Sequence, residues 1–227
     1  MIDTVFSHAL EPAGLQEQHL SATLGSMMHG SVDYADLYFQ VSRQESWSAE
    51  DGIIREGSYN HSQGVGVRAV SGEKTGFAYS DELLLPALQQ AASAAKAIAR
   101  AGDSKTLQAW ERKQLAPLYS SIDPTSSISD QQKTEMLMRV DEATRALDKR
   151  VEQVMLSMTS SHELVLVAAS DGTFAADARP LVRFNVSVIL EDNGRREQGY
   201  AGGGARADLN YFQSGDVAIQ SARDAVR

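Results

Sequence analysis

The sequence predicts an α+β fold in which helices cover antiparallel sheets. Short runs rich in β-branched and aromatic residues follow one another through tight-turn signals, and segments with apolar residues at helical spacing bracket each series. The order helix, strands, Asp-Gly turn, strands, x-Gly turn, strand, helix occurs twice. We therefore expect internal duplication of a helix–β-meander–helix unit, with chance similarity of two α+β units as the alternative.

The first predicted unit covers residues 1–103 and begins with a helix. Leucines and methionines recur at helical spacing over 15–28, and Gly30 ends the run. Hairpin turns are predicted at Asp51-Gly52 and Ser71-Gly72, because glycine at these positions favours a tight reversal. The predicted strands are 35–41, a short run around Trp47, 53–59, 64–70 and 74–79.

A second helix is predicted over 81–101, and it closes the first unit. Its apolar face is rich in alanine, which favours close packing on a sheet. Pro86 is expected in the first turn, where its missing amide costs nothing, and Gly102 as a left-handed C-terminal cap. Residues 104–128 are polar and are interpreted as a connection between the two units.

The second predicted unit covers residues 129–227. Its first helix begins at Ser129, which forms a capping box with Gln132. A last helix is expected from about Ser214 to Arg227, where it is interpreted as truncated before an absent catalytic domain. Its predicted strands and turns are 151–158, 163–169, the Asp171-Gly172 turn, 173–177, 181–190, the Asn193-Gly194 turn and 195–201.

Composition excludes several classes of function. A net charge of −9 argues against nucleic-acid binding, which needs a basic surface. The apolar runs are too short to span a membrane, and the first ten residues lack the features of a signal peptide. The 227 residues contain no cysteine, which agrees with a reducing compartment. A cytoplasmic protein without nucleic-acid or membrane partners is expected.

No catalytic or metal-binding residue can be assigned from the sequence. His162-Glu163 begins like a zinc-peptidase motif, but Leu166 stands where a second histidine is needed, and the segment resembles a strand. The other histidines are scattered. We therefore predict no catalytic residue, no metal ligand and no cofactor in these 227 residues.

Two glycine-rich segments are candidate binding surfaces. Gly64, Gly66 and Arg68 should share one strand face, and the sequence lacks the helix that a dinucleotide site needs next. Structural packing and a functional surface both remain open there. The second segment, Gly202-Gly203-Gly204 with Arg206, follows a predicted strand. It is either a flexible hinge or a bare strand edge that binds an extended peptide.

Several segments resemble the N-terminal half of the TldD/PmbA family of metallopeptidases. The similarity runs in order over nearly the whole chain and is carried by 33–40, 45–47, 64–69, 71–79, 168–172, 179–183 and 202–204. The resemblance implies a peptidase that works with a TldE/PmbA-type sister subunit and by self-association, on unfolded peptide substrates. Leader-peptide maturation, antitoxin degradation and modulation of DNA gyrase are the roles it implies.

The resemblance also implies a zinc or other divalent metal in the full-length protein, held by a His-Glu-x-x-x-His helix and a later cysteine. Neither element occurs in this chain. The sequence therefore predicts a substrate-guiding and assembly domain that is inactive alone. The alternatives are a non-catalytic binding protein that regulates gyrase or a toxin–antitoxin system, and a hydrolase with an unrecognised site.

Overall fold

The structure is a computed structural model that describes residues 1–29, 32–99, 107–112, 118–213 and 216–227. The sequence analysis places helix ends at Gly30 and Gly102 and a helix start near Ser214, and these three residues lie outside the described ones. The helices are α1 (Ile2–Ala9), α2 (Glu17–Met28), α3 (Leu85–Ile98), α4 (Asp130–Leu147) and α5 (Val217–Val226), with short 3-10 turns at Glu11–Ala13, Pro124–Ser126 and Leu209–Phe212.

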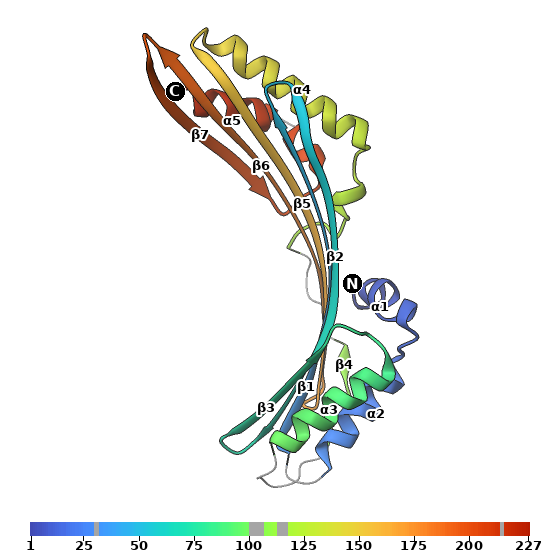
Figure 1. The fold of residues 1–227 in the computed structure, drawn as a ribbon. Coiled ribbons are helices and arrows are strands. Elements are labelled where there is room, and N and C mark those ends of the chain that lie inside the picture. The colour runs from blue at the N-terminus through green and yellow to red at the C-terminus, as the bar shows by residue number, and fades with distance from the viewer. Residues whose placement is uncertain (30–31, 100–106, 113–117, 214–215) are drawn as a thin grey trace. The chain divides into compact units, whose positions relative to one another are not determined.

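The seven strands form one sheet, which confirms the α+β class (Figure 1). Their order is β3-β2-β1-β5-β6-β4, and β7 also pairs with β6. The β2–β3 and β6–β7 pairs are antiparallel, whereas the short β4 runs parallel to β6. The strands are β1 (Tyr34–Glu50), β2 (Ile53–Ser71), β3 (Lys74–Ser80), β4 (Glu111–Arg112), β5 (Val151–Ala169), β6 (Thr173–Asp192) and β7 (Arg195–Ala205).

Four of the strands are about twice as long as predicted. The separate runs at 35–41 and around Trp47 are one strand, β1, and the runs at 53–59 and 64–70 are one strand, β2. The same merging produces β5 and β6 in the second half. Residues 60–63, which join the two predicted runs of β2, are all exposed, so no apolar alternation marks them in the sequence. Pairing with the neighbouring strand keeps such a polar stretch extended.

The predicted turns and the predicted capping box are confirmed. Asp51-Gly52 and Asn193-Gly194 adopt left-handed backbone angles at both residues, as a two-residue hairpin turn requires. Ser129 and Gln132 form the capping box of α4. The sequence analysis missed α1, although its buried residues Ile2, Val5, Phe6 and Ala9 have helical spacing.

The chain forms two compact units, and neither is continuous in sequence. Unit 1 contains Met1–Ser42, His61–Pro117 and Glu163–Ala178, and unit 2 contains Arg43–Asn60, Leu118–His162 and Arg179–Arg227. The predicted division cuts the chain once, at residues 104–128. In the structure, the tip of each long hairpin belongs to the unit that contains most of the other half of the sequence. The division into residues 1–103 and 129–227 stays a prediction.

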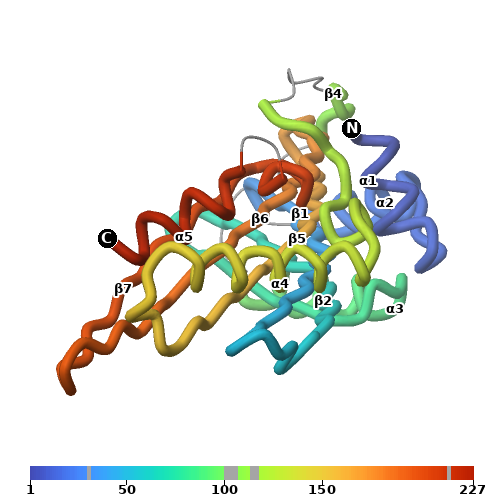
Figure 2. The backbone as a smooth tube through the Cα atoms, turned by 90° about the horizontal axis from the view of Figure 1, so that it is seen from above, coloured from blue at the N-terminus to red at the C-terminus, as the bar shows by residue number. Residues whose placement is uncertain are grey.

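Each unit has its own hydrophobic core on one side of its strands. In unit 1, α1, α2 and α3 pack on alternate residues of β1, β2, β5 and β6. In unit 2, α4 and α5 lie side by side on the strands (Figure 2) and cover residues such as Leu156 and Phe184. The alternate strand residues point to the other side, which we call the open face of each unit.

Candidate functional site

The glycine run lies inside a paired strand. The predicted strand ended at residue 201, but β7 continues to Ala205. Gly202 lies opposite Asn185 of β6, Gly203 opposite Phe184 and Gly204 opposite Arg183. The three glycines are therefore extended sheet residues and do not follow the strand as a separate loop.

The three glycines point in different directions. A Cβ atom at Gly202 would lie 2.6 Å from the carbonyl oxygen of Phe184, and one at Gly204 would lie 2.4 Å from that of Val182. Both positions need glycine because the two strands approach too closely for a side chain. A Cβ atom at Gly203 would instead face α5, 3.9 Å from Val217. Gly202 and Gly204 thus belong to the open face, and Gly203 to the helix side.

A polar cluster lies on the open face beside Gly202. The Asn185 side-chain oxygen accepts hydrogen bonds from Tyr200 Oη at 2.8 Å and from Arg183 Nε at 2.9 Å. A second Arg183 nitrogen donates to Tyr200 at 3.2 Å, and Asn185 Nδ2 donates to Ser157 Oγ at 3.1 Å. We call these four residues the Asn185 cluster. The sequence analysis missed it, although polar residues alternate with buried ones along β6.

Arg206 lies one residue beyond the end of β7. One of its terminal nitrogens donates to the carbonyl oxygen of Pro180 at 3.3 Å, and its guanidinium lies 5.6 Å from the ring centre of Tyr119. These contacts hold the side chain close to β6. A guanidinium has five N–H donors, so one bond to Pro180 leaves donors for a further acceptor.

The outer edge of β7 lies beside these residues. Within the described part of the chain, β7 pairs with β6 alone. Alternate residues of such an edge strand direct their N–H and C=O groups away from the sheet. The candidate surface of unit 2 therefore combines a strand edge, two side-chain-free positions and the Asn185 cluster.

The second candidate segment lies on the open face of unit 1, as predicted. Val65 and Val67 are buried in the core, whereas Gly64 and Gly66 line a hollow of about 340 Å³. Tyr38 from β1 and the aromatic residues of β3 line the same hollow. This arrangement brings together three strands that the sequence could not place side by side.

Arg68 is already engaged with neighbouring side chains and does not line the hollow. Its Nε and a terminal nitrogen donate to one oxygen of Asp36 at 2.7 and 2.5 Å, and its guanidinium lies 5.5 Å from the Tyr34 ring centre. The hydrogen bond with Asp36 raises the pKa of Arg68 further. Burial, followed by the charge of Asp36, raises the pKa of the Tyr34 hydroxyl. Arg68 therefore stabilises the sheet.

His162 and Glu163 point to opposite sides of β5, so they do not act as a pair. His162 lies on the core side of unit 2, and its Nδ1 is 3.5 Å from Asp123. Its Nε2 is buried and has no hydrogen-bond partner in the described structure. Glu163 lies in unit 1, where it accepts a hydrogen bond from Gln40 at 2.5 Å.

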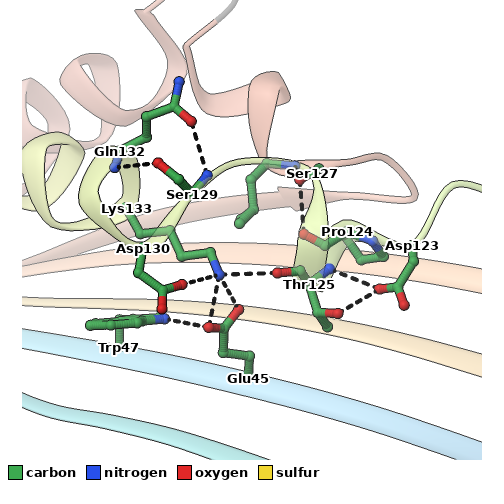
Figure 3. A network of polar contacts seen from close by, with 11 residues as sticks. Glu45, Trp47, Asp123, Pro124, Thr125, Ser127, Ser129, Asp130, Gln132 and Lys133 are labelled. Carbon is green, nitrogen blue, oxygen red and sulfur yellow. Dashed lines mark hydrogen bonds and ion pairs between the residues drawn. The ribbon is translucent and has the colours of Figure 1, made fainter.

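A buried lysine fixes the beginning of α4 on β1 (Figure 3). Lys133 is 3% exposed, and its Nζ donates to both oxygens of Glu45 at 2.8 and 2.7 Å. It also donates to Asp130 and to the carbonyl oxygen of Thr125, each at 3.0 Å. All three Nζ protons therefore have acceptors, as a buried ammonium group requires.

The described residues do not fit a metal ion. No three His, Cys, Asp or Glu side chains within the described ranges come together as ligands. Among the residues that the structure describes, the Asp123–His162 pair has no third ligand. Among the same residues, no helix is both long and apolar enough to cross a bilayer.

Sequence comparisons relate both halves of the chain to metallopeptidases. Residues 35–99 match domain 1 of the PmbA/TldA metallopeptidases, and residues 123–227 match their central domain. The chain is 46% identical to the metalloprotease TldD homolog of Haemophilus influenzae, over 100% of the chain and 48% of that protein. It is 39% identical to the TldD homolog of Buchnera aphidicola subsp. Acyrthosiphon pisum, over 92% of the chain and 43% of that protein. The chain spans about half the length of these curated relatives.

Solved structures share the fold at much lower sequence identity. A putative modulator of a DNA gyrase from Thermotoga maritima has a TM-score of 0.72 and 14% identity, covering 92% of this chain and 47% of that one. TldE from Thermococcus kodakarensis has a TM-score of 0.67 and 17% identity, covering 91% of this chain and 47% of that one.

Proposed function

The chain belongs to the PmbA/TldD metallopeptidase family, and we propose that it is the substrate-guiding and assembly part of a peptidase that cleaves unfolded peptides. The open edge of β7 is the observation that carries this proposal. An extended peptide would add there as a further strand, and each main-chain hydrogen bond would contribute about 0.5–1.5 kcal/mol. Such binding does not depend on sequence, which suits a peptidase with varied unfolded substrates.

The residues around this edge would hold the peptide. Gly202 and Gly204 leave the open face without side chains, so a peptide can lie close to the sheet. Tyr200, which is 61% exposed, offers an aromatic surface beside them. Arg206 would donate to a peptide carbonyl or carboxylate with the nitrogens that Pro180 does not use. Gly203 would only support the packing of α5.

The proposal places the metal chemistry outside these 227 residues. The described side chains do not form a metal site, so we derive no catalytic step from them. In the full-length peptidase, a zinc or other divalent ion would polarise the scissile carbonyl and activate water. The segment described here would contribute the peptide's position and contacts with a TldE/PmbA-type sister subunit. Leader-peptide maturation and antitoxin degradation are the reactions we propose for the whole enzyme.

Peptide binding to this chain tests the proposal directly. Fluorescence anisotropy would compare an unstructured ten-residue peptide, a scrambled version, and a version with N-methyl groups at alternate residues. We expect the scrambled peptide to bind equally well. The N-methylated peptide should bind roughly tenfold more weakly or worse, because it cannot complete a β-ladder. Equal binding of the N-methylated peptide would contradict strand addition.

Two arginine variants test whether the peptide-binding site lies near Arg206 of unit 2. Arg206→Ala should weaken peptide binding and, in the full-length enzyme, peptide cleavage. Arg195→Ala is the matched control, since Arg195 is an exposed arginine at the other end of β7. The alternative function, a non-catalytic regulator of DNA gyrase or a toxin–antitoxin system, predicts that none of the peptides binds and that the full-length protein does not cleave them.

A further inference from the structure

The hollow on the open face of unit 1 contains three aromatic side chains that lie outside the hydrophobic core. Tyr38 is 37% exposed, Phe77 57% and Tyr79 80%. All three line the hollow, Tyr38 from β1 and the other two from the edge strand β3. Aromatic residues gathered on an exposed concave surface are typical of a binding site. A ligand that covers them removes their apolar surface from water, which favours binding.

Glycines give the hollow its shape. A Cβ atom at Gly66 would lie 3.2 Å from the Phe77 ring, so the ring rests directly over the β2 backbone. A Cβ atom at Gly64 would lie 2.9 Å from the carbonyl oxygen of Ser80. Side chains at these two positions would therefore push Phe77 and the end of β3 away. The hollow is built by these glycines and is not a gap between loops.

The charge of the hollow is negative. Asp81 is the one charged residue among the described residues that line it, and neither lysine nor arginine is among them. The Asp81 carboxylate makes no hydrogen bond or ion pair with another described residue, and Asp81 is exposed. An anionic ligand would meet repulsion here, and one carboxylate is too few for a metal ion. Aromatic faces beside a carboxylate attract a cation.

We propose that this hollow binds a cationic side chain, lysine or arginine, of an unfolded peptide. The proposal rests on the proposed function, because the cation would belong to an unfolded peptide, and it assigns a separate peptide contact to the β3 edge of unit 1. The cation would lie against Tyr38, Phe77 and Tyr79 and form an ion pair with Asp81. In the described structure β3 pairs only with β2, so a peptide extended along its free edge would present alternate side chains on this open face.

A pair of small probes tests the hollow without depending on peptide binding elsewhere. N-acetyl-arginine amide and N-acetyl-citrulline amide have nearly the same shape, but only the arginine compound carries a charge. NMR titration of the chain should show shifts of the Gly64 and Gly66 amides with the arginine probe. The citrulline probe should bind about tenfold more weakly. Equal binding of the two probes, or shifts confined to other residues, would overturn the inference.

Matched variants separate the contribution of the Asp81 carboxylate to cation binding from that of the aromatic rings. Asp81→Asn should weaken the arginine probe about tenfold, with Glu82→Gln as the neighbouring control. Tyr79→Ala should weaken it several-fold, with Tyr59→Ala as the control, since Tyr59 is 62% exposed and lies outside the hollow. Unchanged affinity in both test variants would refute the site. If no peptide binds although the arginine probe does, the proposed peptidase role fails and the cation site stands.

Discussion

The two units dock a helix on an edge strand in the same way. In unit 1, α3 packs on β3, and a Cβ atom at Gly76 would lie 2.0 Å from the carbonyl oxygen of Ala95. In unit 2, α5 packs on β7, and a Cβ atom at Gly199 would lie 1.7 Å from the carbonyl oxygen of Ala225. In both units a strand glycine lets helix backbone touch sheet backbone. This correspondence supports the predicted duplication.

The units differ in what lies around this common scaffold. The open face of unit 1 carries an aromatic hollow with the Asp81 carboxylate, which has no partner among the described residues, whereas that of unit 2 carries glycines and the Asn185 cluster. Their charged groups differ as well. Lys133 of unit 2 is buried among acceptors, while Arg68 of unit 1 is half exposed. The helix docking is thus common to both units and the open-face surfaces differ, so we expect function to reside in the surfaces.

The largest difference in stability between the two units should appear when Lys133 of unit 2 and Arg68 of unit 1 are each replaced by a neutral residue. Lys133→Met leaves the Glu45 carboxylate buried without its main partner, and this should cost about 3–5 kcal/mol of unfolding free energy. Urea unfolding measures the change, with the exposed Lys149→Met as control. The double variant Lys133→Met with Glu45→Gln should recover part of the loss. A cost below that of an ordinary surface variant would contradict the structural role of Lys133.

The shared helix docking can be tested in both units at once. Gly76→Ala and Gly199→Ala should each lower the unfolding free energy by about 3 kcal/mol, because the new methyl group collides with helix backbone. Gly203→Ala is the matched control on the same side of β7, where a Cβ atom has room, and should change stability little. If only one of the two variants is destabilised, the units do not share this docking.

Unit 2 should respond to acid through Asp123. Burial alone would raise the pKa of this carboxyl, but hydrogen bonds from His162 and Thr125 outweigh burial and lower it well below the ordinary value. A carboxyl with a lowered folded pKa stabilises the protein above its unfolded pKa of about 4 and loses this contribution as pH falls further. Asp123→Asn should therefore cost about 2 kcal/mol at pH 7. The difference from wild type should shrink in unfolding experiments below about pH 4. A difference that does not depend on pH would exclude this linkage.

The smallest effect is expected at the Arg68–Asp36 pair of unit 1. The Arg68 side chain is 48% exposed, so water screens the ion pair and can reach Asp36, which is 11% exposed, once the arginine side chain is removed. Arg68→Ala should lower the unfolding free energy by about 1 kcal/mol or less. Addition of salt should reduce the difference between variant and wild type. A cost as large as that of Lys133→Met would remove the electrostatic contrast between the two units.

Local features were predictable because they depend on a few neighbouring residues. Three of these features are encoded within a few consecutive residues. They are the capping box of Ser129 and Gln132, the Asn193-Gly194 turn and the alternation around Val65 and Val67. The full length of β2 was not predictable, since residues 60–63 between the two predicted runs are polar and only their pairing keeps them extended. The helix α1 was encoded in the spacing of four residues and was overlooked.

The sequence by itself determined the α+β class, the family, the positions of the turns and the face on which Gly64 and Gly66 lie. Tertiary structure alone decided which distant residues meet. It placed Asn185 beside Gly202, His162 beside Asp123, and Tyr38 beside the aromatic residues of β3. The physical reason is that turns and caps are short-range interactions. The open-face sites depend on strand register and pairing order, which emerge only when long hairpins assemble into one sheet.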